Sequence, residues 1–225
     1  MKINELQPIE YLPNSNEDID SKNNPTEQFI NEEPASRPED FKMLLDIYIN
    51  ESDFGVDISN GYIYLTGEID ETTFEYIVKR INILRKFRAD DDAPITFIIN
   101  SFGGDAYEAF GIIDYIRSLP FKIDVITYTK AMSAAAMILI AATGTRRMSA
   151  NATLMLHELS SESFGKAGDI KANTKHLKSL ENIIYDILHD CTKKPKTHWI
   201  KHLNPDLYLT AKQSLLYGLI DEILD

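Results

Sequence analysis

Residues 125–142 of this chain read VITYTKAMSAAAMILIAA and join a strand-like run to a helix-like run. The first four residues are β-branched or aromatic, and such side chains suit a buried strand. The alanine-rich half has high helix propensity. The joint falls at Ser133, a residue type favoured at helix N-caps. Backbone N–H groups and the helix dipole favour negative charge at such a joint. Ser133 is therefore a candidate nucleophile, with simple helix capping as the alternative.

The segments around this joint alternate between strand and helix patterns. The strands are short apolar runs, as in a parallel sheet covered on both faces, and the helices carry apolar residues at i, i+3, i+4 spacing. Strands are predicted at residues 62–66, 94–100, 122–128 and 153–156, and helices at 71–87, 106–119, 133–142, 167–191 and 211–217. This order predicts an α/β fold built from βαβ units.

Residues 1–40 differ in composition from the rest of the chain. They hold five of the nine prolines, and ten acidic residues against three basic ones. Their few apolar residues follow neither a helical nor a strand period. We interpret them as a flexible acidic N-terminal extension: a pro-segment, a docking arm or a solubilising tail. Residues 41–225 are long enough for one α/β domain, in which residues 41–49 fit either a short helix or an edge strand.

Composition argues against several classes of function. A net charge of −12 disfavours binding to nucleic acid or to anionic membranes. The longest apolar run, residues 134–142, is far shorter than the ~20 residues that span a bilayer, and the first residues lack the hydrophobic core expected of a signal peptide. The single cysteine, Cys191, fits a reducing, cytoplasmic setting. No Cys/His cluster has metal-ligand spacing, so we expect neither a metal nor another cofactor.

Three of the predicted strands end in residues that can take part in catalysis. Gly103-Gly104 ends one, Ser133 follows the next, and His157 ends a third. Because the carboxyl ends of parallel strands share one edge, these residues are expected to converge. Acyl transfer needs backbone donors for an oxyanion, a base for the serine proton and a carboxylate to orient that base. His157 fits the base and Asp206 fits the carboxylate. Each also has an ordinary alternative as a turn or hydrogen-bonded residue.

Several blocks of sequence resemble the Clp protease proteolytic subunit, ClpP, and stand in family order. They are INSFGG at 99–104, AMS at 131–133, LMLHE at 154–158, YIYLTGEI at 62–69, and DLYLTA at 206–211 with YGLID at 217–221. The resemblance covers roughly residues 58–225. It implies the ClpP/crotonase-like fold of repeated ββα/βαβ units, with a long protruding handle helix starting at Ala167.

The resemblance also implies a role for each matching residue. Ser133 would be the nucleophile, His157 the general base, and Asp206 the residue that orients His157. The backbone N–H groups of Gly104 and Ala134 would form the oxyanion hole. The implied activity is that of an ATP-dependent-type serine endopeptidase, which hydrolyses unfolded polypeptides inside an oligomeric chamber. The implied partners are copies of the chain itself, in two stacked rings of seven, and an AAA+ unfoldase.

Four positions depart from the family pattern. Phe102 stands in place of the usual proline, Thr129 and Ala135 in place of usual glycines, and Glu158 in place of the usual glutamine. The oxyanion donors are main-chain groups, which side-chain changes do not remove. The departures therefore bear on efficiency and substrate preference more than on the chemistry.

Three other functions compete with this one. A ring subunit without activity would assemble or dock an unfoldase, but such relatives typically lose a triad member. A capsid-maturation-type protease would cleave without an unfoldase. An acyl-CoA enzyme of the related crotonase fold also uses two backbone donors, although it needs no Ser/His/Asp set.

Overall fold

A computed structural model describes residues 42, 49, 55–87, 94–160 and 164–224 of the chain. Two compact units are distinguished, Met1–Met43 and Leu44–Asp225, and the second contains almost all of the described residues. The acidic extension over residues 1–40 lies outside the described residues, as does most of the 41–49 segment. Their assignments stay predictions.

A single mixed sheet forms the centre of the second unit. Its strands are β1 (Val56–Asp57), β2 (Tyr62–Ile69), β3 (Ile95–Gly104), β4 (Ile123–Met132), β5 (Arg146–Ser149), β6 (Thr153–Leu156), β7 (Leu207–Thr210) and β8 (Glu222–Leu224). The order is β1-β2-β3-β4-β5-β8, while β6 pairs with β4 and β7 pairs with β6. The pairs β1–β2 and β6–β7 are antiparallel and the others are parallel.

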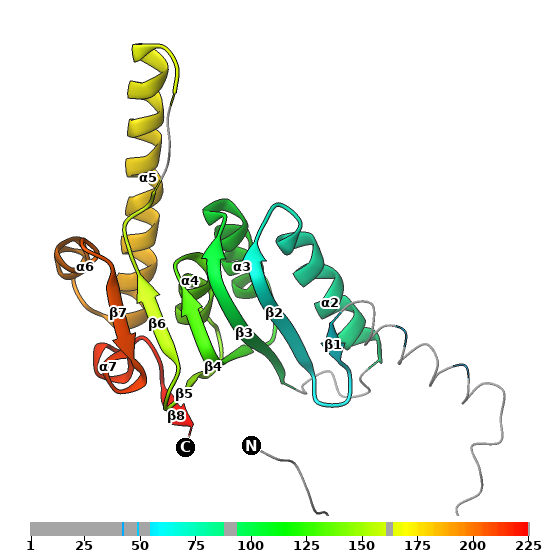
Figure 1. Ribbon diagram of the computed structural model, residues 1–225. Helices are drawn as coiled ribbons and strands as arrows, with labels where there is room; N and C mark the ends of the chain where they lie inside the picture. Colours follow the sequence, from blue (N-terminus) through cyan, green and yellow to red (C-terminus); the bar gives the residue numbers. More distant parts are fainter. Residues whose placement is uncertain (1–41, 43–48, 50–54, 88–93, 161–163, 225) are drawn as a thin grey trace, which may run out of the picture. The chain divides into compact units, whose positions relative to one another are not determined.

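Helices cover the sheet and extend beyond it. They are α2 (Thr73–Phe87), α3 (Ala106–Ser118), α4 (Ala134–Ile140), α5 (Ala167–Thr192), α6 (Lys196–His202) and α7 (Ala211–Tyr217). Figure 1 shows α2, α3 and α4 on one face of strands β2–β4, with α5 extending past the ends of these strands. The predicted α/β class is therefore confirmed.

Helix α4 is the most deeply buried element. All seven of its residues are buried, and it contacts β3, β4, α3 and α5. Its small alanine side chains allow the backbone to approach the sheet closely. The residue that joins β4 to α4 is therefore held by the core on both sides.

Strand β4 changes partner along its length. Residues 125–127 pair with β5, whereas residues 130–132 pair with β6. Between these parts the register against β3 shifts, because Ile99 lies opposite Thr127 but Ser101 lies opposite Ala131. β4 therefore has two extra residues there, which form a β-bulge. Bulges change the direction of side chains and are frequent beside active sites.

Helix α5 is 26 residues long and leaves the body of the unit. Every described residue from 164 to 176 is exposed, whereas the buried positions gather in the second half of the helix, at Leu180, Ile184, Tyr185, Ile187 and Leu188. This is the long protruding helix that the family resemblance implied.

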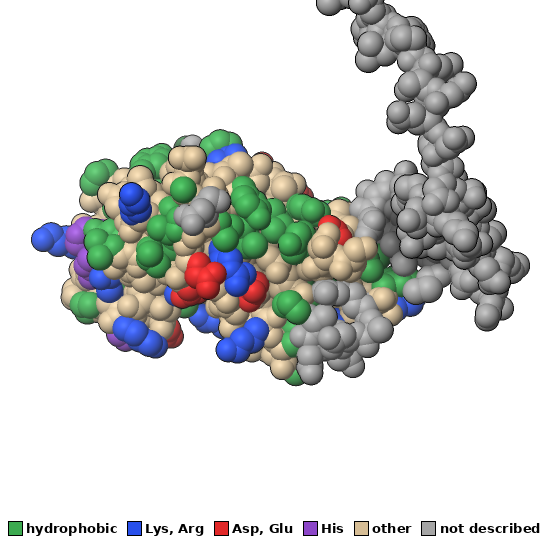
Figure 2. Space-filling view, turned by 90° about the horizontal axis from the view of Figure 1, so that it is seen from below, with side chains coloured by type: hydrophobic (Ala, Val, Ile, Leu, Met, Phe, Trp, Pro, Cys, Tyr) green, Lys and Arg blue, Asp and Glu red, His purple; other side chains and the backbone are tan. Residues whose placement is uncertain are grey.

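Ion pairs fasten the C-terminal strand to the sheet. Arg147 of β5 lies 3.0 Å from a carboxylate oxygen of Asp124 and 2.7 Å from one of Glu222. These contacts link β8 through β5 to β4. Figure 2 shows one side of the molecule, where acidic and basic side chains form a small group among hydrophobic ones.

The structure also corrects details of the predicted elements. Strands β3 and β4 extend to Gly104 and Met132, beyond the predicted ends at residues 100 and 128. The glycine turn continues β3, because Gly104 still pairs with Ile69 of β2. The short elements β1, β5, α6, β7 and β8 were not predicted; they have few residues and half-polar patterns, so periodicity does not reveal them.

Candidate active site

Ser133 has an unusual backbone conformation between β4 and α4. Its dihedrals are φ 52° and ψ −123°, a region that residues other than glycine avoid. Its N–H donates to the Met155 carbonyl at 2.9 Å, which ties the turn to β6. The hydroxyl makes no capping hydrogen bond to α4, so simple helix capping is wrong. Such strain is typical of a sharp strand-to-helix turn that exposes a nucleophile.

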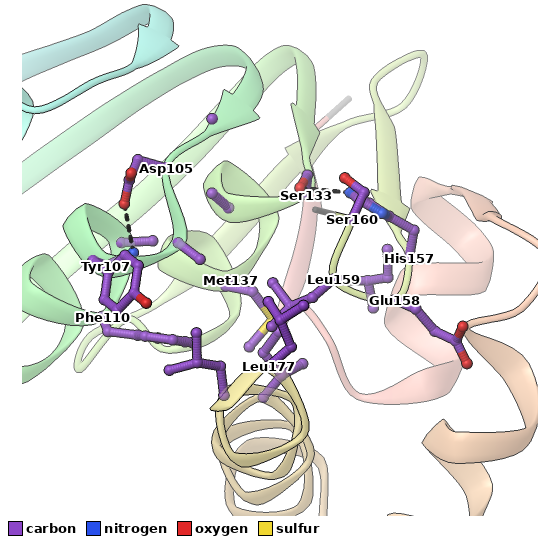
Figure 3. A pocket seen from close by; sticks show the side chains of 17 residues that line it. Asp105, Tyr107, Phe110, Ser133, Met137, His157, Glu158, Leu159, Ser160 and Leu177 are labelled. Carbon is purple, nitrogen blue, oxygen red and sulfur yellow. Dashed lines mark hydrogen bonds between the residues drawn. The ribbon is translucent and has the colours of Figure 1, made fainter. Parts of the chain in front are cut away.

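His157 lies beside Ser133 because β6 runs parallel to the end of β4. Met132 pairs with Met155, so the residues that follow these two strands emerge at the same edge. The Nε2 atom of His157 lies 2.7 Å from the Ser133 Oγ, and both side chains are half-buried (Figure 3). This is the distance required between a nucleophile and its general base.

The glycine turn at the end of β3 packs directly against Ser133. A side chain on Gly103, at φ 103°, would place its Cβ 2.7 Å from the Met132 carbonyl oxygen and 2.8 Å from the Ser133 Cβ. The Gly103 N–H donates to the buried Ser101 hydroxyl at 3.0 Å. Only glycine therefore permits this approach.

Gly104 and Ala134 line the same cavity as Ser133. Ala134 is the first residue of α4, and the first N–H groups of a helix have no partner within the helix. The structure thus brings both predicted oxyanion donors beside Ser133.

Asp206 is the predicted site residue that the structure does not join to the others. Its side chain is exposed, and among the described residues no hydrogen bond links it to His157. It precedes β7 and follows the cis peptide bond Asn204–Pro205. Nearby, the Glu158 carboxylate accepts a hydrogen bond of 3.0 Å from the Asn204 side-chain amide.

A cavity of about 330 Å³ opens beside the serine–histidine pair (Figure 3). Its walls come from the start of α3, from α4, from the segment after β6 and from α5. Their larger apolar side chains are those of Phe110, Met137, Leu156, Leu159, Leu177, Leu180 and Ile184, and their polar side chains are those of Asp105, Tyr107, Ser133, His157, Glu158 and Ser160. A site of this kind accepts an uncharged, apolar group next to the nucleophile.

Two polar residues that line the cavity, Asp105 and Tyr107, form hydrogen bonds with neighbouring groups. The Asp105 carboxylate caps α3 by accepting from the N–H groups of Tyr107 and Glu108, at 2.7 and 3.1 Å. The Tyr107 hydroxyl lies 2.7 Å from Nε2 of His176, which connects α3 to α5.

The apolar wall is the part of the site that sequence reasoning missed. Leu177, Leu180 and Ile184 stand out as the apolar stripe of the predicted helix, but nothing in the sequence says that they face Ser133. In the part of the chain that the structure describes, three or more His, Cys, Asp or Glu side chains never gather to hold a metal ion. No helix there is both long and apolar enough to cross a membrane.

The comparisons with known proteins fit this fold. The sequence profile of the Clp protease family matches residues 53–225. The chain therefore belongs to the Clp protease family, and it is a peptidase.

Individual relatives are similar over most of their length. The chain is 30% identical over 194 residues to "ATP-dependent Clp protease proteolytic subunit 2" of Treponema denticola, which covers 86% of this chain and 92% of that protein. It is 31% identical over 163 residues to the "ATP-dependent Clp protease proteolytic subunit" of Dehalococcoides mccartyi, covering 72% of this chain and 80% of the relative. The corresponding subunit of Deinococcus radiodurans is 29% identical over 169 residues.

Proposed function

We propose that this chain is a serine endopeptidase in which Ser133 attacks the peptide carbonyl and His157 is the general base. The observation that carries the proposal is the 2.7 Å contact between Ser133 Oγ and His157 Nε2, at a turn whose dihedrals expose the hydroxyl. In the first step the Ser133 proton passes to Nε2 as Oγ bonds to the carbonyl carbon. The imidazolium then donates that proton to the leaving amine, which frees the new N-terminus and leaves an acyl-enzyme for water to hydrolyse.

The developing oxyanion is stabilised by the N–H groups of Gly104 and Ala134. Removing one such donor typically slows an enzyme by about 10²–10³. Asp206 orients His157 and stabilises its charged form, as the family pattern implies. The Asp206 side chain is exposed to solvent in this structure. It therefore has to rotate toward His157 to take this role.

The apolar cavity supports a preference for apolar substrate residues next to the cleaved bond. A leucine or methionine side chain fits a volume of about 330 Å³ and can pack against the apolar part of the walls. An acidic residue at the same position would lose hydration and would lie beside the carboxylates of Asp105 and Glu158.

The chain works, in this proposal, as a homo-oligomer of two stacked heptameric rings with an AAA+ unfoldase, in the cytoplasm. The support is that the relatives are named as subunits of ATP-dependent proteases. The exposed first half of α5 adds to it, because a projecting helix with few contacts in its own chain gains stability from packing against a neighbouring copy. Unfolded polypeptides are the substrates.

Two alternatives remain. The exposed Asp206 favours a ring subunit that assembles without cleaving. A capsid-maturation-type protease would share the site but need no unfoldase.

Labelling with a fluorophosphonate probe tests the proposal. Mass spectrometry is expected to find the probe on Ser133 in the unchanged protein, and no labelling in the Ser133→Ala or His157→Ala variants. Peptide cleavage that persists in assembled Ser133→Ala protein would exclude Ser133 as the nucleophile. An unchanged protein that assembles but neither labels nor cleaves would favour the non-catalytic subunit.

A further inference from the structure

Four side chains gather on β3 and β4, next to the glycine turn and outside the apolar cavity. The Asn100 side-chain oxygen accepts hydrogen bonds of 2.7 Å from the Thr129 hydroxyl and 2.7 Å from the Lys130 ammonium group. The same ammonium group lies 4.3 Å from the centre of the Phe102 ring. We call these four residues the Asn100 cluster. Two of them, Phe102 and Thr129, are positions that depart from the family pattern.

The bulge in β4 makes this cluster possible. Thr129 and Lys130 are consecutive, and consecutive side chains of a regular strand point to opposite faces. Both nevertheless bond to one oxygen atom of Asn100, because the register shift between β3 and β4 falls at these residues. The bulge thus aims Lys130 over Phe102.

Lys130 is bound to the cluster rather than to an acidic partner. None of the ion pairs between described residues includes it. Its charge is satisfied by the Asn100 oxygen and by the face of the Phe102 ring, an attraction that aromatic rings offer to cations. The Phe102 side chain is 70% exposed, and this contact with Lys130 ties its ring to β4.

Phe102 immediately precedes the turn that carries the proposed oxyanion donor. Gly103 packs against Ser133 so closely that a Cβ would meet the serine at 2.8 Å. On its buried side, the turn is held by the hydrogen bond from the Gly103 N–H to the Ser101 hydroxyl. On its exposed side, the contact between Lys130 and the Phe102 ring restrains the residue that precedes the turn. A proline would restrict the turn through its fixed φ, and here a side-chain contact can restrict it instead.

We propose that Lys130 is a positioning residue for catalysis: by holding Phe102 through the Asn100 cluster, it fixes the Gly103–Gly104 turn for oxyanion stabilisation. This inference rests on the proposed peptidase mechanism of Ser133. Lys130 acts through Phe102 and the turn, not by touching the reacting atoms.

A double-mutant cycle on the full chain tests the proposal. Lys130→Met and Phe102→Leu are each expected to lower kcat on a fluorogenic peptide about two- to fivefold, with KM nearly unchanged. The double variant is expected to be no slower than the slower single variant. A peptide boronate, which forms a tetrahedral adduct with serine, is expected to bind more weakly by the same factor. The control Lys122→Met removes an exposed lysine that precedes β4 and keeps full activity.

Several results would overturn the inference. They are multiplicative losses in the double variant, a change confined to KM, and unchanged boronate affinity. A third variant, Phe102→Pro, restricts the turn without the ring, so adding Lys130→Met to it is expected to have no further effect; a further loss would contradict the inference. If the proposed peptidase mechanism of Ser133 were wrong, the result would be distinguishable. The unchanged protein would then show neither Ser133-dependent cleavage nor boronate binding.

Discussion

Leu156 of β6 lies opposite Leu207 of β7 in the antiparallel pairing of these two strands. His157 follows the first of these residues and Asp206 precedes the second. The two residues therefore flank the last pair of this ladder, and just beyond it the Glu158 N–H donates to the Leu203 carbonyl at 3.3 Å. The backbone thus offers Asp206 a place beside His157 although the side chains are not bonded. This relationship supports the proposed role of Asp206 without reference to a sequence motif.

Asp206→Asn is expected to lower kcat by about 10²–10⁴, because an amide no longer favours the required tautomer and charge of His157. The measurement is peptide cleavage by assembled protein, with fluorophosphonate labelling of Ser133 as a second readout. Glu158→Gln, which keeps an oxygen acceptor for Asn204, provides the comparison. If Glu158→Gln produced the larger loss, Glu158 and not Asp206 would be the carboxylate that His157 needs.

Gly103→Ala is expected to lower both activity and stability. The added Cβ would meet the Met132 carbonyl and Ser133, and φ 103° is strained for alanine, with a typical penalty of about 1–3 kcal/mol. Displacing the turn from Ser133 is expected to slow cleavage about 100-fold.

Gly168→Ala is the matched control for that change. Gly168 lies in α5, has open space around its Cβ position and is expected to gain up to about 1 kcal/mol of helix stability as alanine. Thermal unfolding and peptide cleavage of both variants check the pair. Equal unfolding midpoints and equal cleavage rates in the two variants would mean that Gly103 is not in close contact with Ser133.

Much of the site could be predicted from the order of the strands. Gly104, Ser133 and His157 each follow an apolar run, and the parallel arrangement of those runs brings the three residues to one edge. The Ser133 turn could be located because alanine-rich and β-branched runs meet there. These features are local or periodic, so one sequence is enough to recognise them.

The remaining parts depend on contacts between distant residues. The apolar wall joins Phe110 to Leu177 across 66 intervening positions, and no linear pattern indicates that they share a cavity. The bulge at Thr129 and Lys130 arises from the register between β3 and β4, which composition does not encode. The same holds for Asp206, since its family motif predicts a role but not the orientation of its side chain.

Leu177→Asp is expected to raise KM for peptides with an apolar residue before the cleaved bond, by about tenfold or more. The carboxylate would stand in an otherwise apolar wall and oppose burial of the substrate side chain. Labelling of Ser133 by a small fluorophosphonate is expected to stay within about twofold, because Leu177 does not touch the reacting atoms. Leu216→Asp, at an 81% exposed position of α7, is the control. An unchanged KM in the Leu177 variant would show that the cavity does not bind substrate.

Arg146 and Asp221 form an ion pair in the C-terminal region. Arg146 donates from Nη2 to Oδ1 at 2.6 Å and from Nε to Oδ2 at 3.0 Å, and its backbone N–H adds a bond of 2.8 Å to Oδ2. The same guanidinium donates to the Gly218 carbonyl at 3.1 Å. These bonds hold the Asp221 pKa below its usual value of 3.8, chiefly through the Arg146 side chain.

Asp221→Asn is expected to destabilise the protein by about 0.5–1 kcal/mol at pH 7, a small value because the Asp221 side chain is 41% exposed. A carboxyl group with a lowered pKa binds fewer protons in the folded state, so its contribution is present above pH ~4 and is lost as the pH falls through the folded-state pKa. Thermal unfolding midpoints should therefore differ by about 2 °C at pH 7 and pH 5, and converge below pH 4. Glu75→Gln, whose partner Lys79 is on the exposed surface of α2, is expected to change the midpoint less. A difference between Asp221→Asn and the unchanged protein that grew on acidification would contradict this assignment of the ion pair.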